Sequence, residues 1–277
     1  MIKADKYYKD NLKEILENGS WDENPRPKYK DGKEANSKFI TQVFETYDIN
    51  KGEYPITTLR NTATLTGIKE VLWIYQKQNS SLESAREMGI KWWDEWNIGD
   101  NTIGERYGKT INNYDLMNKV LKSLKEDPFS RRHIINMYQE TDLRSTDGLY
   151  PCAYETIWSV RKDKDDTLFI DMTLIQRSND YLVAGFINKI QYTALLMMVC
   201  SHLNYKPGKF SHLIQNLHIY DRHIEAAKEI LDNDPIDKQP ILSMNKKDNF
   251  YDFDINDFKV SNIKDIPKLK SELELAI

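Results

Sequence analysis

The stretch AYETIWSVRKDKDDTLFIDMTLIQR, residues 153–177, indicates the fold of this chain most directly. Residues 153–161 and 168–177 each alternate apolar and polar side chains at a period of two, which is typical of β-strands. In the first segment Tyr154, Thr156 and Trp158 fall on one face. The charged tract KDKDD (162–166) separates the two segments and has the composition of a turn. The pattern therefore predicts a β-hairpin.

The segments around this hairpin predict a larger sheet packed against a helix. HIINMYQE (133–140) and FSHLIQNLHIY (210–220) are also interpreted as strands. INKIQYTALLMMVCSHL (187–203) is apolar nearly all round, which indicates a buried central helix. No repeat or domain boundary interrupts the chain, so we expect residues 1–277 to form a single mixed α/β domain of the α+β type.

The rest of the chain predicts further helices and two irregular regions. Helices are expected at residues 5–17, 66–78, 113–127 and 221–233, with Pro128 ending the third and Asp221 capping the fourth. SSLE (80–83) offers a capping box for a short helix. Residues 22–38 are interpreted as a loop, and the last forty or so residues as irregular and charged.

Composition excludes several classes of protein. A chain of 277 residues with 40% hydrophobic and 30% charged residues suits a globular protein with a sizeable core. A net charge of -4 argues against a protein that binds nucleic acid over its whole surface. Its two cysteines provide no disulfide framework, and no C-x-x-C or histidine-rich spacing indicates zinc. The start MIKADKYYKD does not resemble a signal peptide, and the apolar run YTALLMMVC is too short to span a bilayer, so we expect a cytoplasmic protein.

Cys152 is notable because it follows Pro151 at the start of a predicted strand. A buried cysteine is usually a small hydrophobic core residue. A nucleophilic cysteine instead needs a fixed position, an opening and a positive neighbour. The local sequence is compatible with either role.

Two polar clusters have both a structural and a functional interpretation. Arg131 and Arg132 follow a helix, where they could form a solvated face or a bidentate phosphate clamp. The segment QRSND (176–180) ends an apolar strand and could be a polar turn. Alternatively, Arg177 and Ser178 could bind an anion there, because ligands sit at strand ends in α/β proteins.

Two further positions are open in the same way. His218 and Tyr220 lie two residues apart on a strand and share a face, beside Asn216. A core histidine is the ordinary explanation, but a paired histidine and tyrosine could also bind a ligand. Glu70, in IKEVLWIY, is either an exposed helix residue or a buried acid with a raised pKa that suits proton transfer.

The order and spacing of these elements carry a family resemblance. A glutamate in a tryptophan-containing helix, then WDEW, GERYG, DPFSRRHI, PC, QRSND, an asparagine eight residues after that aspartate, and HIY follow one another. Together with the C-terminal LAI, this series resembles thymidylate synthase over nearly the whole chain. The resemblance implies a mixed β-sheet covered by helices, with the sheet packing at a homodimer interface.

The resemblance also implies an activity. Thymidylate synthases methylate dUMP to dTMP, with 5,10-methylenetetrahydrofolate as both one-carbon donor and reductant, and release dihydrofolate without using a metal. A deoxypyrimidine monophosphate hydroxymethylase would share the early steps and then add water. A nucleotide- or RNA-binding protein without turnover would keep the arginines but would not need Cys152, Glu70 and the tail together. We expect no binding to DNA or membranes.

The resemblance assigns roles to individual residues. Cys152 would be the nucleophile, with Glu70, Asn188 and Arg177 as the other catalytic residues. The residues expected to bind dUMP are Arg26, Arg131, Arg132, Arg177, Ser178, Asn179, Asp180, Asn188, His218 and Tyr220. Arg131 and Arg132 would reach into the site from the second subunit. Trp93, Asp180 and Ala276 are expected to face the folate.

Overall fold

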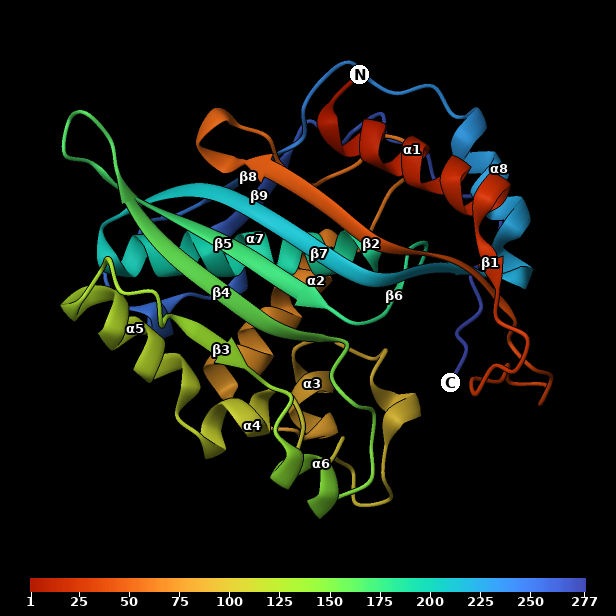
Figure 1. Ribbon diagram of the computed structural model, residues 1–277, viewed down its shortest axis with the longest axis horizontal. Coiled ribbons are helices and arrows are strands. Elements are labelled where there is room, and N and C mark those ends of the chain that lie inside the picture. The colour runs from red at the N-terminus through yellow and green to blue at the C-terminus, as the bar shows by residue number, and fades with distance from the viewer.

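The computed structural model describes residues Met1–Ile277 and is built on a mixed sheet of seven strands (Figure 1). The strands are β1 (Ser20–Trp21), β2 (Ser37–Asp48), β3 (Ile134–Asn136), β4 (Ala153–Lys162), β5 (Leu168–Gln176), β6 (Asn179–Asp180) and β7 (Lys206–Tyr220). Their order is β1-β2-β7-β5-β4-β3, with β6 beside β7. The β5–β7 and β6–β7 pairs are parallel, and the other pairs are antiparallel.

The predicted hairpin is confirmed and lies inside this sheet. β4 and β5 pair antiparallel from Lys162↔Leu168 to Ala153↔Gln176. The register shifts between Ala153 and Glu155, so the strand is irregular next to Cys152. β5 then pairs with β7 in parallel, which is possible because the long helix α7 (Gly185–Leu203) connects them.

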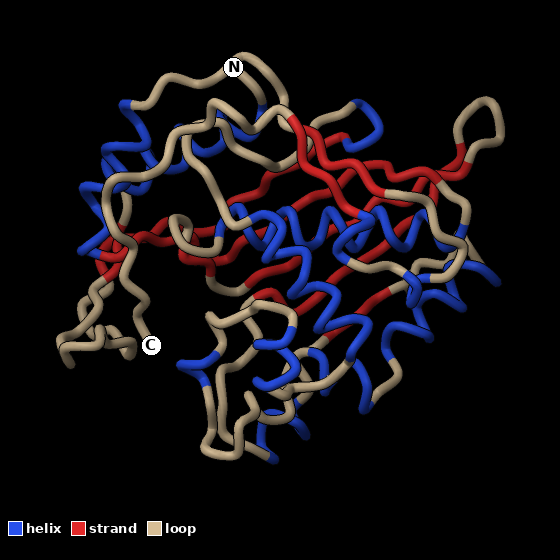
Figure 2. Tube along the Cα trace, turned by 180° about the vertical axis from the view of Figure 1, so that it is seen from behind, coloured by secondary structure: helices blue, strands red, loops and turns tan.

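The structure has eight α-helices, and most of them lie on one side of the sheet (Figure 2). They are α1 (Lys3–Asn18), α2 (Thr64–Leu72), α3 (Leu82–Glu87), α4 (Gly108–Asn113), α5 (Leu116–Glu126), α6 (Glu140–Ser145), α7 (Gly185–Leu203) and α8 (Ile224–Asp232). The predicted helices at 5–17, 66–78, 113–127, 187–203 and 221–233 are thus confirmed, with small shifts at their ends. No helix is long and apolar enough to cross a membrane.

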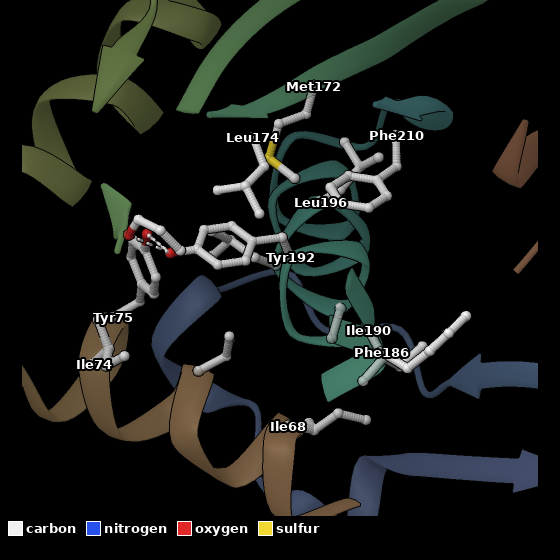
Figure 3. Close-up of a cluster of buried hydrophobic side chains, with 14 of the residues drawn as sticks. Ile68, Ile74, Tyr75, Met172, Leu174, Phe186, Ile190, Tyr192, Leu196 and Phe210 are labelled. Carbon is white, nitrogen blue, oxygen red and sulfur yellow. Dashed lines mark hydrogen bonds between the residues drawn. The ribbon is translucent and has the colours of Figure 1, made fainter. Parts of the chain in front are cut away.

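Helix α7 lies in the middle of the core, as its apolar sequence predicts. Figure 3 shows α7 with Met172, Leu174 and Phe210 of the sheet on one side and Ile68 and Tyr75 on the other. One cluster of 54 buried hydrophobic residues extends from Ala4 to Phe258. A core that draws on both ends of the chain supports the proposal that residues 1–277 form one domain.

The opposite face of the sheet has no helix over it (Figure 1). Phe44 on β2 is 56% exposed, and Leu213 and Ile175, which follow it across β7 and β5, are partly buried. Apolar side chains therefore point outward from the centre of the sheet.

Several local predictions were wrong. Strand β2 was not predicted, because Gln42 with φ 59° is skipped in the pairing with β7 and interrupts the alternation. Its inward face also carries Glu45, which forms a buried ion pair with Lys189 at 2.9 Å. In the predicted strand 133–140 only Ile134–Asn136 pairs as a strand, and α6 begins at Glu140.

Helix caps and the C-terminal region also differ from prediction. Ser81 rather than Ser80 caps α3, and it accepts a hydrogen bond from Ser84 N–H. Asp221 does not cap α8, because its carboxylate accepts a hydrogen bond from the Tyr29 hydroxyl. The C-terminal region, expected to be irregular, contains a two-stranded sheet of β8 (Ile241–Met244) and β9 (Phe258–Ser261).

Candidate active site

A cavity of about 280 Å³ lies where β5, β6 and β7 end and α7 begins. It collects most of the residues that sequence analysis selected, although they are spread over 250 positions of the chain. The predicted residues that line it are Arg26, Glu70, Trp93, Cys152, Arg177, Ser178, Asp180, Asn188, His218, Tyr220 and Ala276. The structure contains no group of three or more His, Cys, Asp or Glu side chains that could hold a metal ion.

Cys152 is fixed at the start of β4 by contacts on both sides. Its backbone N–H donates to the Tyr107 hydroxyl at 3.0 Å, and Arg177 Nη2 lies 3.4 Å from its Sγ. Arg177 is itself held by the carbonyls of Pro151 and Tyr150. Burial raises the pKa of the Cys152 thiol, while the positive charges of Arg177 and Arg26 lower it less strongly. The thiol thus lies beside a cation, but it must lose a proton to react.

Tyr107 is a site residue that sequence analysis missed. It lies in GERYG, but nothing in that local sequence shows that the chain brings it to Cys152, 45 residues away. Its φ of 48° is unusual for a residue with a side chain. The neighbouring Arg106 is fully buried and donates to the carbonyls of Asp142 and Thr146. These bonds hold the segment that contains Tyr107 against residues 142–146. Backbone strain such as the positive φ of Tyr107 is concentrated at functional sites.

Glu70 is a buried acid, which decides between the two interpretations of its sequence. Its side chain is 7% exposed and accepts a hydrogen bond from Trp92 Nε1. Burial raises the pKa of Glu70 to about 7, although the hydrogen bond from Trp92 and the nearby N–H groups of Gln191 and Trp93 oppose the shift. A carboxyl group with a pKa near neutrality can both give and accept a proton.

This pKa predicts a pH-dependent stability. Folded Glu70 titrates near pH 7, whereas the ordinary pKa is 4.5, so between these values the folded state binds the extra proton. Raising the pH through this window should therefore destabilise the wild type by about 3 kcal/mol relative to Glu70→Gln. Urea unfolding of both proteins at about pH 4 and about pH 8 measures the difference. A constant difference at the two pH values would contradict the raised pKa.

Asn188, on the first turns of α7, is held by a network of amides. Its Oδ1 accepts from Gln176 Nε2 at 3.1 Å and from Asn179 Nδ2 at 3.3 Å. Its Nδ2 donates to Gln191 Oε1 at 3.0 Å. Because an amide nitrogen carries two hydrogens, one N–H of Asn188 remains available to a ligand.

His218 and Tyr220 both line the cavity, as their shared strand face predicts. Their rings meet edge to face at 5.1 Å. Burial lowers the pKa of His218, so its imidazole is neutral at pH 7, and burial raises that of Tyr220. Asn216 Oδ1 lies 2.9 Å from His218 Nδ1 and accepts a hydrogen bond from the Nδ1–H of the neutral ring, which leaves Nε2 as an acceptor.

Three predicted residues do not line this cavity. Arg131 and Arg132 are exposed, in the turn between α5 and β3. Asn179 is 1% exposed and lies behind Asn188, to which it donates. A role for Asn179 would therefore be to orient Asn188, and the roles of the two arginines stay predictions.

The C-terminal tail closes one side of the cavity. Leu275, Ala276 and Ile277 line it, and two backbone hydrogen bonds of 2.8 and 3.0 Å join Ile277 to Lys28. Lys28 follows Arg26 and Pro27, which also line the cavity. The segment that begins with Arg26 and the C-terminal tail are thus paired directly.

Comparisons with known proteins agree with this arrangement. A sequence profile of thymidylate synthase matches residues 6–275. The chain belongs to the thymidylate synthase family. It is 48% identical to thymidylate synthase from Lactococcus lactis subsp. lactis, over 99% of this chain and 100% of the relative. It is 47% identical to thymidylate synthase from Streptococcus pneumoniae, with the same coverage of both proteins.

Structural comparison confirms the fold. Thermostable thymidylate synthase A from Bacillus subtilis superposes with a TM-score of 0.89 at 31% identity, covering 99% of both chains. The predicted thymidylate synthase fold, with its mixed sheet and covering helices, is therefore confirmed. As a thymidylate synthase, the enzyme is a methyltransferase that acts on dUMP, and the comparisons do not favour the hydroxymethylase or the non-catalytic binding protein.

Proposed function

We propose that the cavity binds dUMP and 5,10-methylenetetrahydrofolate together and that Cys152 attacks C6 of the uracil ring. The convergence of Cys152, Glu70 and Asn188 on one cavity carries this proposal. A thiol, an acid with a pKa near 7 and a free amide N–H are the groups needed to add to a uracil ring and stabilise the product.

The cavity offers a separate set of contacts for each part of dUMP. Arg26, Arg177 and Ser178 provide donors for the phosphate dianion. Neutral His218 can accept a hydrogen bond from the deoxyribose 3'-hydroxyl, and the Tyr220 hydroxyl lies beside it. Asn188 then faces the base, with its free N–H available to O4.

The proposed chemistry begins when the Cys152 thiol gives its proton to water and the thiolate sulfur forms a bond to C6, while the electron pair of the C5–C6 double bond moves toward C5 and O4. The free N–H of Asn188 stabilises the charge that develops on O4. Glu70, whose pKa is about 7, exchanges protons with O4 and C5 through ordered water. Arg177, 3.4 Å from Sγ, favours the thiolate during attack. Tyr107 keeps the backbone of the nucleophile in place.

The residues present fit a folate beside the nucleotide. Trp92, Trp93 and Trp96 line the cavity with Leu275 and form an apolar, aromatic wall for a flat heterocycle. Buried Trp93 Nε1 and Gln191 Nε2 lack a hydrogen-bond partner and could donate to it. When bound, the folate supplies the one-carbon unit and the hydride that reduces it. Asp180 and Ala276 remain proposed folate contacts.

We further propose that the enzyme is a homodimer formed through the uncovered face of the sheet. Phe44 is 56% exposed there, and a partner's sheet would bury it with Leu213 and Ile175. Arg131 and Arg132 are exposed and lie outside the cavity of their own chain, which suits donation to the partner's phosphate site. The cytoplasm remains the proposed compartment, because a thiol nucleophile must stay reduced.

The direct test is to mix the protein with dUMP and 5,10-methylenetetrahydrofolate and follow dihydrofolate absorbance. We expect an increase that depends on both substrates and equals the dTMP formed. A hydroxymethylase would consume dUMP without making dihydrofolate, and a binding protein would consume nothing. Either result would reject the proposed reaction.

Asn188→Asp should change the choice of base. A carboxylate at this position would still accept from Gln176 and Asn179, but it would repel uracil O4 and attract the amino group of cytosine. We expect the dUMP-to-dCMP ratio of kcat/KM to fall by about a hundredfold or more. Steady-state kinetics with each nucleotide measures this ratio. Equal use of dUMP and dCMP by the wild type would contradict the role of Asn188.

Deletion of Ile277 should impair product formation far more than nucleotide binding. The deletion removes both backbone bonds to Lys28, so the tail would no longer exclude water from the cavity. We expect kcat to fall by about a hundredfold or more, with the dUMP Kd within about threefold of wild type. Unchanged dTMP output from the truncated protein would show that the tail is only a frayed terminus.

A further inference from the structure

Arg222 joins three parts of the chain whose neighbouring residues line the cavity. It follows β7, in a 3₁₀ turn at Asp221–His223. Its Nη1 donates to Glu274 at 2.7 Å and its Nη2 to Asp31 at 2.7 Å. Its guanidinium also lies 3.9 Å from the centre of the Tyr29 ring. One arginine thus uses both ends of its planar fork and its face at the same time.

These partners belong to the two segments that border the cavity. Asp31 and Tyr29 lie in residues 26–35, here named the phosphate loop because it begins with Arg26. Glu274 lies in the tail, residues 272–277. Figures 1 and 2 both show the C-terminus beside the loop that follows β1. The Lys28–Ile277 backbone bonds and the packing of Ala276 on the cluster formed by Tyr29, Ala35 and Tyr220 continue the same contact.

The phosphate loop contacts other walls of the site as well. The Tyr29 hydroxyl donates to Asp221, next to Arg222. Lys30 Nζ lies 3.1 Å from Glu95 Oε1, between Trp93 and Trp96 of the aromatic wall. Both the loop and the tail have largely irregular backbone, so these side-chain contacts, together with the Lys28–Ile277 backbone bonds, hold the two segments in place.

The arrangement is more than a pair of surface ions. An isolated exposed ion pair adds little stability, because water screens it and two long side chains must be ordered. Arg222 is only one third exposed and pairs with two carboxylates while stacking on an aromatic ring. A shared partner of this kind ties two irregular segments to each other and to the sheet.

We propose that Arg222 is a positioning residue that fastens the phosphate loop to the tail, so that capture of the nucleotide phosphate and closure over the folate occur as one coupled event. This inference rests on the proposed function, because it takes Arg26 as a phosphate ligand and the tail as the folate cover. Coupling of this kind is reciprocal: bound nucleotide raises folate affinity by the factor by which folate raises nucleotide affinity.

The test compares Arg222→Met and Glu274→Gln with a matched control, Arg161→Met. Arg161 also pairs with a carboxylate, Asp171 at 2.9 Å, and stacks on Phe169 at 4.6 Å, but it lies at the far end of β4 from Cys152. Dihydrofolate serves as the non-reacting probe. Its Kd is measured by calorimetry with and without saturating dUMP, and the dUMP Kd is measured alone.

We expect dUMP to strengthen dihydrofolate binding to the wild type and to the Arg161→Met control equally. In Arg222→Met this strengthening should be about tenfold smaller, while the dUMP Kd alone changes by less than about threefold. Glu274→Gln should show a smaller loss of coupling than Arg222→Met. The double variant should resemble Arg222→Met, because both substitutions remove the same Arg222–Glu274 contact. High salt should weaken the coupling in the wild type more than in Arg222→Met.

Two outcomes would overturn the proposal. The first is a coupling factor in Arg222→Met within about twofold of the wild type. The second is an equal loss of dUMP binding, dihydrofolate binding and urea stability, which would mark Arg222 as a general structural residue. If Arg222→Met does not fold, Glu274→Gln and Asp31→Asn give the same comparison with isosteric changes. Failure of the proposed function is distinguishable, because the wild type would then form no dihydrofolate.

Discussion

Cys152→Ala is expected to abolish dTMP formation while leaving dUMP binding measurable. The substitution removes the sulfur that attacks C6, so turnover should fall by at least about 10⁴-fold. The phosphate, sugar and base contacts of Arg26, His218 and Asn188 remain, so the dUMP Kd should change by less than about tenfold. Dihydrofolate absorbance measures turnover, and calorimetry measures binding.

Cys200→Ala is the matched control for this prediction. Cys200 is 1% exposed in α7, does not line the cavity, and burial raises the pKa of its thiol well above the ordinary value. The control should keep activity within about tenfold of wild type. A 5-fluoro analogue of dUMP, which lacks the removable C5 proton, should form a covalent complex with folate and Cys152. An adduct on Cys200 would show that the nucleophile is wrongly assigned.

Mixing two inactive variants should restore activity if the sites are shared between subunits. One variant carries Cys152→Ala, and the other carries alanine in place of both Arg131 and Arg132. Each homodimer should be nearly inactive. A mixed dimer holds one doubly damaged site and one intact site, because each site takes its arginines from the other chain. Since random exchange makes about half of the dimers mixed, activity should recover to roughly a quarter of the wild-type level.

The same experiment distinguishes the alternative. If Arg131 and Arg132 act in their own chain, every site in every dimer contains a defect and mixing recovers nothing. Subunit exchange must be shown independently, for example by mass spectrometry of differently labelled chains. Proven exchange without recovery would reject the shared site.

The local sequence pattern predicted the central elements of the fold and the family. The alternation in 153–161 and 168–177 and the apolar run 187–203 predicted β4, β5 and α7, because burial of one face, or of all faces, leaves its period in the sequence. The order of the motifs from Glu70 to Tyr220 predicted the family. The motifs can be recognised from the sequence because each short segment contains the residue types that its chemistry needs.

The tertiary structure decided what depends on distant partners. Strand β2 escaped prediction because its inward Glu45 is neutralised by Lys189, 144 residues away. Glu70 could be either exposed or buried until α7 and the tryptophan segment were packed around it, and that burial raises its pKa. No role was predicted for Tyr107, Arg106 and Arg222, because their roles arise from contacts with segments far along the chain. The sequence pattern shows which face of each segment is buried. The protonation state of an acid, the strain of a backbone and the exposure of a side chain are decided only when segments pack together.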